Sequence, residues 1–180
     1  MANLPVPILA SELPNNLFTA ALARAGIVNA GTFFLNPPLF VGTQTSAQSI
    51  PNSGSVWTAI NLNTEQVDSY GGHDTVTNNS RYTAQVAGLY QVCGVVGFAN
   101  NATGVRGARL HVNGSVVQGT AQMTLAANGS GTGLPTPIRT VRLAAGDFVE
   151  VAGWQSSGAA LSTITAADVA SALFVCWAGM

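Results

Sequence analysis

One short segment gathers most of the side chains that could bind a metal or move a proton. It contains Glu65, Asp68, His73 and Asp74. Carboxylates on a loop can hold Ca²⁺, which takes roughly six to eight oxygen ligands, but the alternating Asp spacing and terminal Glu of a calcium loop are absent. The sequence therefore predicts no metal site, with calcium as the alternative. The simpler interpretation is a polar loop whose side chains bond backbone groups and either Arg81 or Arg106.

Other arrangements that catalyse reactions are missing. Zinc needs converging ligands, and the two histidines, His73 and His111, show no metal-ligand spacing. Gly129-Ser130-Gly131 lies in a predicted loop rather than on the strand-to-helix turn that exposes a hydrolase nucleophile. The close carboxylate pairs, Glu65/Asp68 and Asp147/Glu150, have ordinary loop and turn explanations rather than flanking a glycosidic bond. We expect a protein that is not an enzyme and carries no cofactor.

Saccharide binding is harder to exclude, because aromatic rings can stack on a sugar and amides can bond its hydroxyls. The candidate aromatics are Trp57, Tyr70, Trp154 and Trp177. Trp177 ends the last predicted strand, where a core or interface position is expected. Trp154 is the better candidate for an exposed ligand-binding ring.

Composition limits the partners. Only 7% of residues are charged, 47% are hydrophobic and the formal net charge is -1. That balance excludes the basic surface of a nucleic-acid-binding protein. Polar residues and glycine interrupt every apolar run, so no membrane-spanning helix is expected, and the N-terminus lacks the pattern of a signal peptide. Water solvates a surface with so few charges poorly. The composition therefore predicts an oligomer rather than a monomer.

Beyond about residue 37 the pattern is that of short β-strands. Residues 81–86 alternate, with Tyr82, Ala84 and Val86 on one face and Arg81, Thr83 and Gln85 on the other. Asn113-Gly114 predicts a hairpin turn and residues 144–147 predict another turn, whereas residues 126–137 read as a long flexible loop. Eight to ten strands with turns every 8–12 residues are typical of a sandwich or jelly roll.

The first 36 residues follow a different pattern and are predicted to be an attachment arm, with the β domain at residues 37–180. The arm is expected to contain one or two short helices: Asn15-Asn16 would cap the first over residues 17–25, which Gly26 ends, and the second would run over residues 27–35. Such short helices need a surface to pack on. The residues expected to make that attachment are Leu17, Phe18, Leu22, Phe33 and Phe34.

Two cysteines, Cys93 and Cys176, lie in apolar runs. They are too few for a disulfide framework, and we expect reduced thiols that behave as small core hydrophobes.

Several motifs resemble the jelly roll shared by the globular head of complement's first component and tumour necrosis factor. They are Gly88-Leu-Tyr90 followed by Val92, Leu110-His-Val-Asn-Gly114, Leu143-Ala-Ala-Gly-Asp147 followed by Val149, and Ser171-Ala-Leu-Phe-Val175. The resemblance covers residues 37–178. It implies an all-β jelly roll that assembles as a compact homotrimer.

Further motifs resemble small virion proteins of tailed actinobacterial phages and their prophages. They are Trp57-Thr-Ala-Ile-Asn61, Tyr70-Gly-Gly-His-Asp74, Asn78-Asn-Ser-Arg-Tyr82, Thr103-Gly-Val-Arg106, and the arm from Phe18 to Pro38. This resemblance implies a non-enzymatic structural protein on the virion surface, decorating or cementing the capsid through its arm. The alternative is a minor tail or tail-tip protein that binds a host-cell saccharide. The expected partners are further copies of the chain and a major capsid or tail protein.

Overall fold

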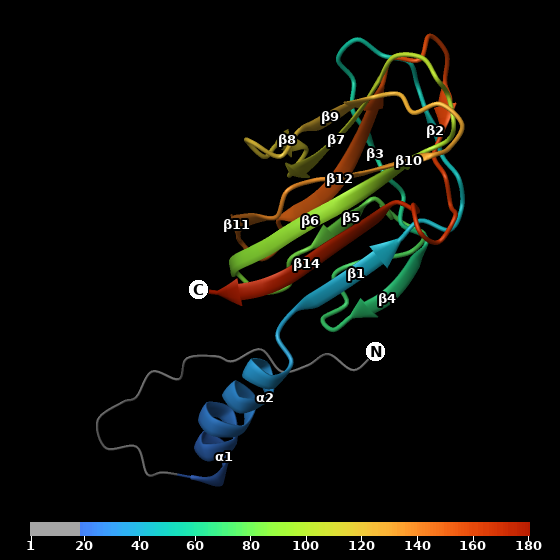
Figure 1. The fold of residues 1–180 in the computed structure, drawn as a ribbon. Coiled ribbons are helices and arrows are strands. Elements are labelled where there is room, and N and C mark those ends of the chain that lie inside the picture. The colour runs from blue at the N-terminus through green and yellow to red at the C-terminus, as the bar shows by residue number, and fades with distance from the viewer. Residues whose placement is uncertain (1–18) are drawn as a thin grey trace.

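In the computed structural model, which describes residues 19–180, two antiparallel six-stranded sheets pack face to face (Figure 1). The first sheet contains β1 (Leu39–Thr43), β4 (Thr64–Asp68), β6 (Gly88–Phe98), β10 (Thr132–Pro135), β11 (Arg139–Leu143) and β14 (Ala172–Gly179). The second contains β3 (Thr58–Ala59), β5 (Arg81–Thr83), β7 (Val105–Val112), β8 (Ser115–Val116), β9 (Gln122–Leu125) and β12 (Phe148–Gln155). A separate pair joins β2 (Ser49–Ile50) to β13 (Leu161–Ser162).

The strand order confirms the predicted jelly-roll sandwich. The first sheet runs β10-β6-β14-β1-β4, with β11 also on β6, so strands from opposite ends of the domain lie side by side. The second runs β3-β12-β7-β8, with β5 on β12 and β9 on β7. Alternate residues of both sheets fill the space between them, and the core includes Phe40, Tyr82, Tyr90, Phe98, Leu110, Val151 and Leu173. Tyr82, Ala84 and Val86 are all buried, as the alternation predicts.

The turn residues act as their sequences predict. Asn113 and Gly114 adopt φ of 51° and 75°, the left-handed conformation that a tight hairpin needs, and they join β7 to β8. The same asparagine also fixes the turn before β12. Its Nδ2 donates to Asp147 Oδ1 at 2.8 Å, and its Oδ1 accepts from the Phe148 N–H at 2.9 Å.

The N-terminal helix is continuous, which agrees with the one or two short helices expected for the arm and corrects only the predicted stop at Gly26. It consists of α1 (Ala20–Ala23), a wider π-helical segment (Arg24–Val28) and α2 (Asn29–Leu35). Gly26 does not end it, because glycine accommodates the right-handed helix as well as the left-handed cap, and the widened turn carries the chain through this position. The helix ends at Asn36, before two prolines. Leu17 and Phe18 lie outside the described residues.

Two further local expectations need correction. Residues 126–137 are not one flexible loop, because β10 pairs with β6 within them, a non-local contact that composition does not reveal. Both cysteines are free but lie on the outward face of the first sheet, half-buried rather than in the core. The reason is strand alternation: Val92 and Gly94 point inward, so Cys93 between them points outward.

Candidate functional site

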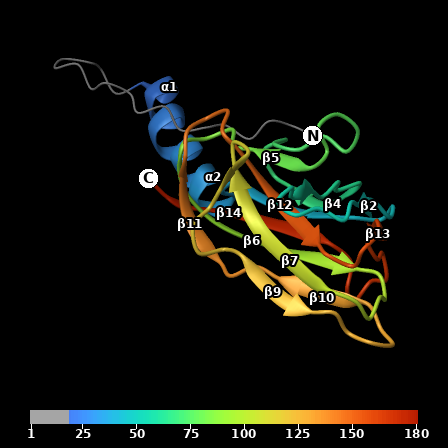
Figure 2. The ribbon, with the colours of Figure 1, turned by 90° about the horizontal axis from the view of Figure 1, so that it is seen from above.

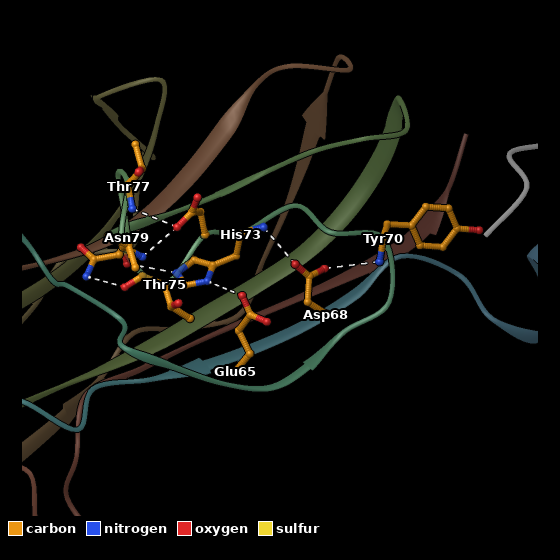
Figure 3. A network of polar contacts seen from close by, with 9 residues as sticks. Glu65, Asp68, Tyr70, His73, Thr75, Thr77 and Asn79 are labelled. Carbon is orange, nitrogen blue, oxygen red and sulfur yellow. Dashed lines mark hydrogen bonds and ion pairs between the residues drawn. The ribbon is translucent and has the colours of Figure 1, made fainter. Parts of the chain in front are cut away.

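A buried histidine organises the polar loop between β4 and β5 (Figure 3). The His73 side chain has no exposed surface, and its Nδ1 lies 2.9 Å from Glu65 Oε1 on β4. Its Nε2 lies 3.1 Å from the backbone carbonyl oxygen of Asn79, and its ring packs on Phe40 with 4.9 Å between the centroids. The loop is therefore tied to the first sheet through one imidazole.

The two partners of His73 define where its protons lie. A carbonyl oxygen only accepts, so Nε2 carries a hydrogen and donates to Asn79. One further proton then lies between Nδ1 and the Glu65 carboxyl group, either as an ion pair or as a neutral hydrogen-bonded pair. Either way, both ring nitrogens are satisfied without a metal.

The neighbouring carboxylates also bond backbone groups. Asp68 accepts from the N–H of Tyr70 through Oδ1 and from the N–H of His73 through Oδ2, at 3.3 and 2.9 Å. Asp74 Oδ1 accepts from the N–H groups of Val76 and Thr77, and these bonds lower the pKa of its carboxyl group. No cluster of three or more potential metal ligands occurs within residues 19–180.

The arginines are not the partners of this loop that the sequence suggests. Arg81 Nε lies 3.7 Å from Glu150 Oε1 on β12. Arg106 is buried and donates to the backbone carbonyl oxygens of Asn101, Thr103 and Val105.

An open polar groove of about 410 Å³ lies between this loop and β5. Its lining residues are Gly71, Gly72, His73, Asp74, Thr77, Asn78, Arg81, Thr83 and Gln85. His73 and Asp74 are predicted from the sequence as candidate site residues, whereas Asn78, Thr83 and Gln85 are not. The signal for the last two was present, because they share the polar face of the alternating segment with Arg81.

Trp154, the predicted sugar-stacking residue, is half-buried on the outward face of the second sheet. Its indole N–H donates to the Ser53 carbonyl oxygen, and its ring stacks on Trp57 with 6.1 Å between centroids. The guanidinium carbon of Arg109 lies 4.2 Å from the centroid of the Trp57 ring. The polar end of Trp154 is therefore engaged within the domain, and sugar stacking on it stays a prediction.

The outward face of the first sheet is apolar and uncharged at its centre. β1, β6 and β14 contain no charged residue, and Val41, Phe174 and Cys93 lie side by side across them in register. These three side chains are only half-buried, and no described helix or strand crosses in front of them in Figure 1. We call this surface the β6–β14–β1 face.

The helix divides its apolar residues between its own domain and solvent. Phe33 is buried against Tyr70, Val86 and Trp177, with 4.8 Å between the Phe33 and Trp177 ring centroids. Phe34, in contrast, is 73% exposed, and Ile27, Val28 and Leu35 are also exposed. Figures 1 and 2 both place the helix at the end of the sandwich where β14 finishes. The backbone at Leu22 belongs to α1.

Solved structures with the same architecture identify the fold. The chain matches the globular domain of zebrafish complement 1qA protein with a TM-score of 0.57 at 10% identity, over 78% of this chain and 96% of that one. The fold is the complement and tumour-necrosis-factor jelly roll. Murine APRIL matches with a TM-score of 0.53 at 15% identity, over 77% and 98% of the two chains. Eiger TNF from S. frugiperda matches with 0.51 at 11% identity, over 79% and 92%.

No protein-family model matches the sequence, and a search of curated proteins finds no match. Within residues 19–180, no helix is long and apolar enough to cross a membrane.

Proposed function

We propose that this chain forms a homotrimer and serves as a non-enzymatic structural protein on the surface of a phage particle. Residues 1–36 hold the trimer on its capsid or tail, and residues 37–180 form the exposed head. The observation that carries the proposal is the β6–β14–β1 face, which is apolar at its centre and free of charge on all three strands.

An apolar sheet face stays exposed in few soluble monomers, because covering it with protein releases water from the apolar surface. Full burial of a Phe side chain contributes roughly 1.5–3 kcal/mol, and the half-buried Phe174 at the centre of this face would gain the remaining part of that on association. Closed rotational symmetry limits the association to a small, fixed number of copies. The resemblance of the motifs to complement and tumour-necrosis-factor heads supports three copies rather than two.

The helix supports an attachment role. Phe33 fixes its C-terminal end to the jelly roll, while Phe34 and Leu35, 73% and 82% exposed, remain available to another protein. Three helices on one trimer would bind a shared surface together, which raises avidity without new contacts at each site. The resemblance to virion proteins of actinobacterial phages supports a capsid or tail protein as that surface.

The attachment is tested by assembling particles with the full chain, with residues 37–180 alone, and with Phe34→Asp combined with Leu35→Asp. The double variant is the sharper test, because it leaves the Phe33 contact intact. We expect mass spectrometry of purified particles to find the full chain and to miss both altered chains. If the altered chains load normally, the anchor lies on the jelly roll and residues 1–36 do not attach the protein.

The alternative role is a tail-tip adhesin for host-cell saccharides. It shares the trimer and the anchor and adds a ligand site on the head, and the open polar groove beside β5 is the observation that favours it.

A further inference from the structure

The groove beside β5 has a floor and a wall of polar side chains. Arg81, Thr83 and Gln85 alternate along one face of the chain and form the floor, while Asp74, Thr77 and Asn78 belong to the loop opposite. The Thr83 N–H donates to the Gly72 carbonyl oxygen at 2.7 Å and joins the two sides. The volume of about 410 Å³ lies within the roughly 300–1,000 Å³ range of small-ligand pockets.

Arg81, which lines this groove, packs against an aromatic ring and faces a carboxylate. Its guanidinium carbon lies 4.0 Å from the centroid of the Phe148 ring, and its Nε faces Glu150 Oε1 at 3.7 Å. Glu150 is itself 6% exposed and accepts from Ser80 Oγ at 2.6 Å, so the carboxylate that orients the arginine is fixed as well. A cation stacked on a ring keeps its donors at the edge of the guanidinium plane, available to a ligand.

Several hydrogen-bonding groups of the groove have no partner among the described residues. They are the two terminal nitrogens of Arg81, the second carboxylate oxygen of Asp74, the side-chain amide of Asn78, the hydroxyl of Thr83 and the amide oxygen of Gln85. Together these supply both donors and acceptors, so a ligand with hydroxyl groups could satisfy them, whereas a wholly apolar ligand would leave them without partners.

The charges around the groove restrict the chemical class of the ligand further. Arg81 brings one positive charge, and Asp74 on the wall and Glu150 behind the arginine bring two negative charges. An anion would meet the Asp74 carboxylate in the lining while Glu150 already offsets the charge of Arg81, and a metal cation would find fewer than three ligands of the usual kind. A neutral molecule rich in hydroxyl groups carries no charge for the carboxylates to repel and needs no set of metal ligands.

We propose that this groove binds a neutral saccharide, with vicinal hydroxyls bridging the Arg81 guanidinium and the Asp74 carboxylate. Two parallel donors on the guanidinium and acceptor oxygens on the carboxylate match adjacent hydroxyls, each of which donates once and accepts. The proposal deepens the adhesin role and rests on it for its biological purpose. The groove itself belongs to one chain, and its floor is on β5 of the second sheet, away from the β6–β14–β1 face.

A printed panel of neutral and acidic oligosaccharides, probed with the full chain, tests the proposal. We expect retention on neutral glycans, and calorimetric titration with the best neutral glycan should show binding weakened at least about tenfold in Arg81→Leu, the loss of one charge-assisted bond. Asp74→Asn should weaken binding too, although its other oxygen still caps the loop. Arg109→Leu is the matched control, because Arg109 also stacks on an aromatic ring, that of Trp57, but lies outside the groove.

Three results would overturn the inference: no glycan retained, only acidic glycans retained, or Arg81→Leu binding as tightly as Arg109→Leu. Melting temperatures of the variants separate lost binding from lost folding. Sedimentation of the same samples keeps this result apart from the proposed function. A monomer that binds neutral glycans contradicts the trimer alone, and a trimer that binds none contradicts the groove alone.

Discussion

Replacing Glu65 shows whether a hydrogen bond or a charge fixes the buried His73. Glu65→Gln can still donate its amide to the His73 Nδ1 lone pair, whereas Glu65→Ala leaves that nitrogen buried without a partner. We expect Glu65→Ala to lower the free energy of unfolding by about 1–3 kcal/mol and Glu65→Gln to stay close to the wild type in urea denaturation. Equal losses in both variants would mean that the charge of Glu65 is what matters.

His111 gives the domain a distinct pH dependence. It is 7% exposed, and its Nε2 accepts a hydrogen bond from Arg109 Nε at 2.8 Å, so the ring is neutral. Burial and the Arg109 charge lower the pKa of His111 below its ordinary 6.5. Glu150 lies opposite in register but bonds Ser80 and faces Arg81.

Because the folded protein resists protonating His111, the neutral ring stabilises it fully only above about pH 6.5. Stability should fall as the pH drops from 6.5 through the lowered folded pKa of His111. Melting temperatures between pH 7.5 and 5 should show this loss, and His111→Gln, whose side-chain oxygen can accept from Arg109, should show less of it. If the melting temperatures of the wild type and of His111→Gln fall in parallel as the pH drops, His111 is not the group responsible.

Among the elements, the N-terminal helix has Phe33 as the buried contact of α2 with the jelly roll. Phe33→Ala should release the helix while the sandwich stays folded, because Phe33 packs on Tyr70, Val86 and Trp177 at the edge of the domain. Fully burying a Phe side chain contributes about 1.5–3 kcal/mol, so trypsin should cleave after Arg24 at least about tenfold faster. Phe34→Ala is the control, since its ring is 73% exposed. Equal cleavage of both variants would show that Phe33 does not hold the helix.

The elements that sequence predicted are those governed by local rules. The turn at Asn113-Gly114 depends only on two neighbouring residues that adopt the left-handed conformation. The strand around Tyr82 depends only on the alternation of buried and polar side chains. β10 and the burial of His111 depend on strands distant in sequence, which no local pattern contains. Likewise, the loop residues Glu65 and His73 stood out by type, but their pairing required β4 to lie beside β1. The predicted helix end at Gly26 was wrong because glycine permits many backbone conformations and does not by itself end a helix.

For the whole molecule, the β6–β14–β1 face should be sensitive to charge. Phe174→Glu places a carboxylate at the centre of that face, where burial against another copy would leave it unpaired. Val116→Glu is the matched control, on β8 of the second sheet and 50% exposed. Sedimentation velocity should show dissociation of Phe174→Glu only. If both variants sediment as the wild type does, copies meet on a different surface.

The most direct measurement is the mass of the full chain in solution by light scattering, from micromolar to tens of micromolar concentration. The apolar face predicts a single species of three times the 18.3 kDa chain mass, unchanged on dilution. A stable species of one chain mass across that range would leave the β6–β14–β1 face uncovered in solution and contradict the account.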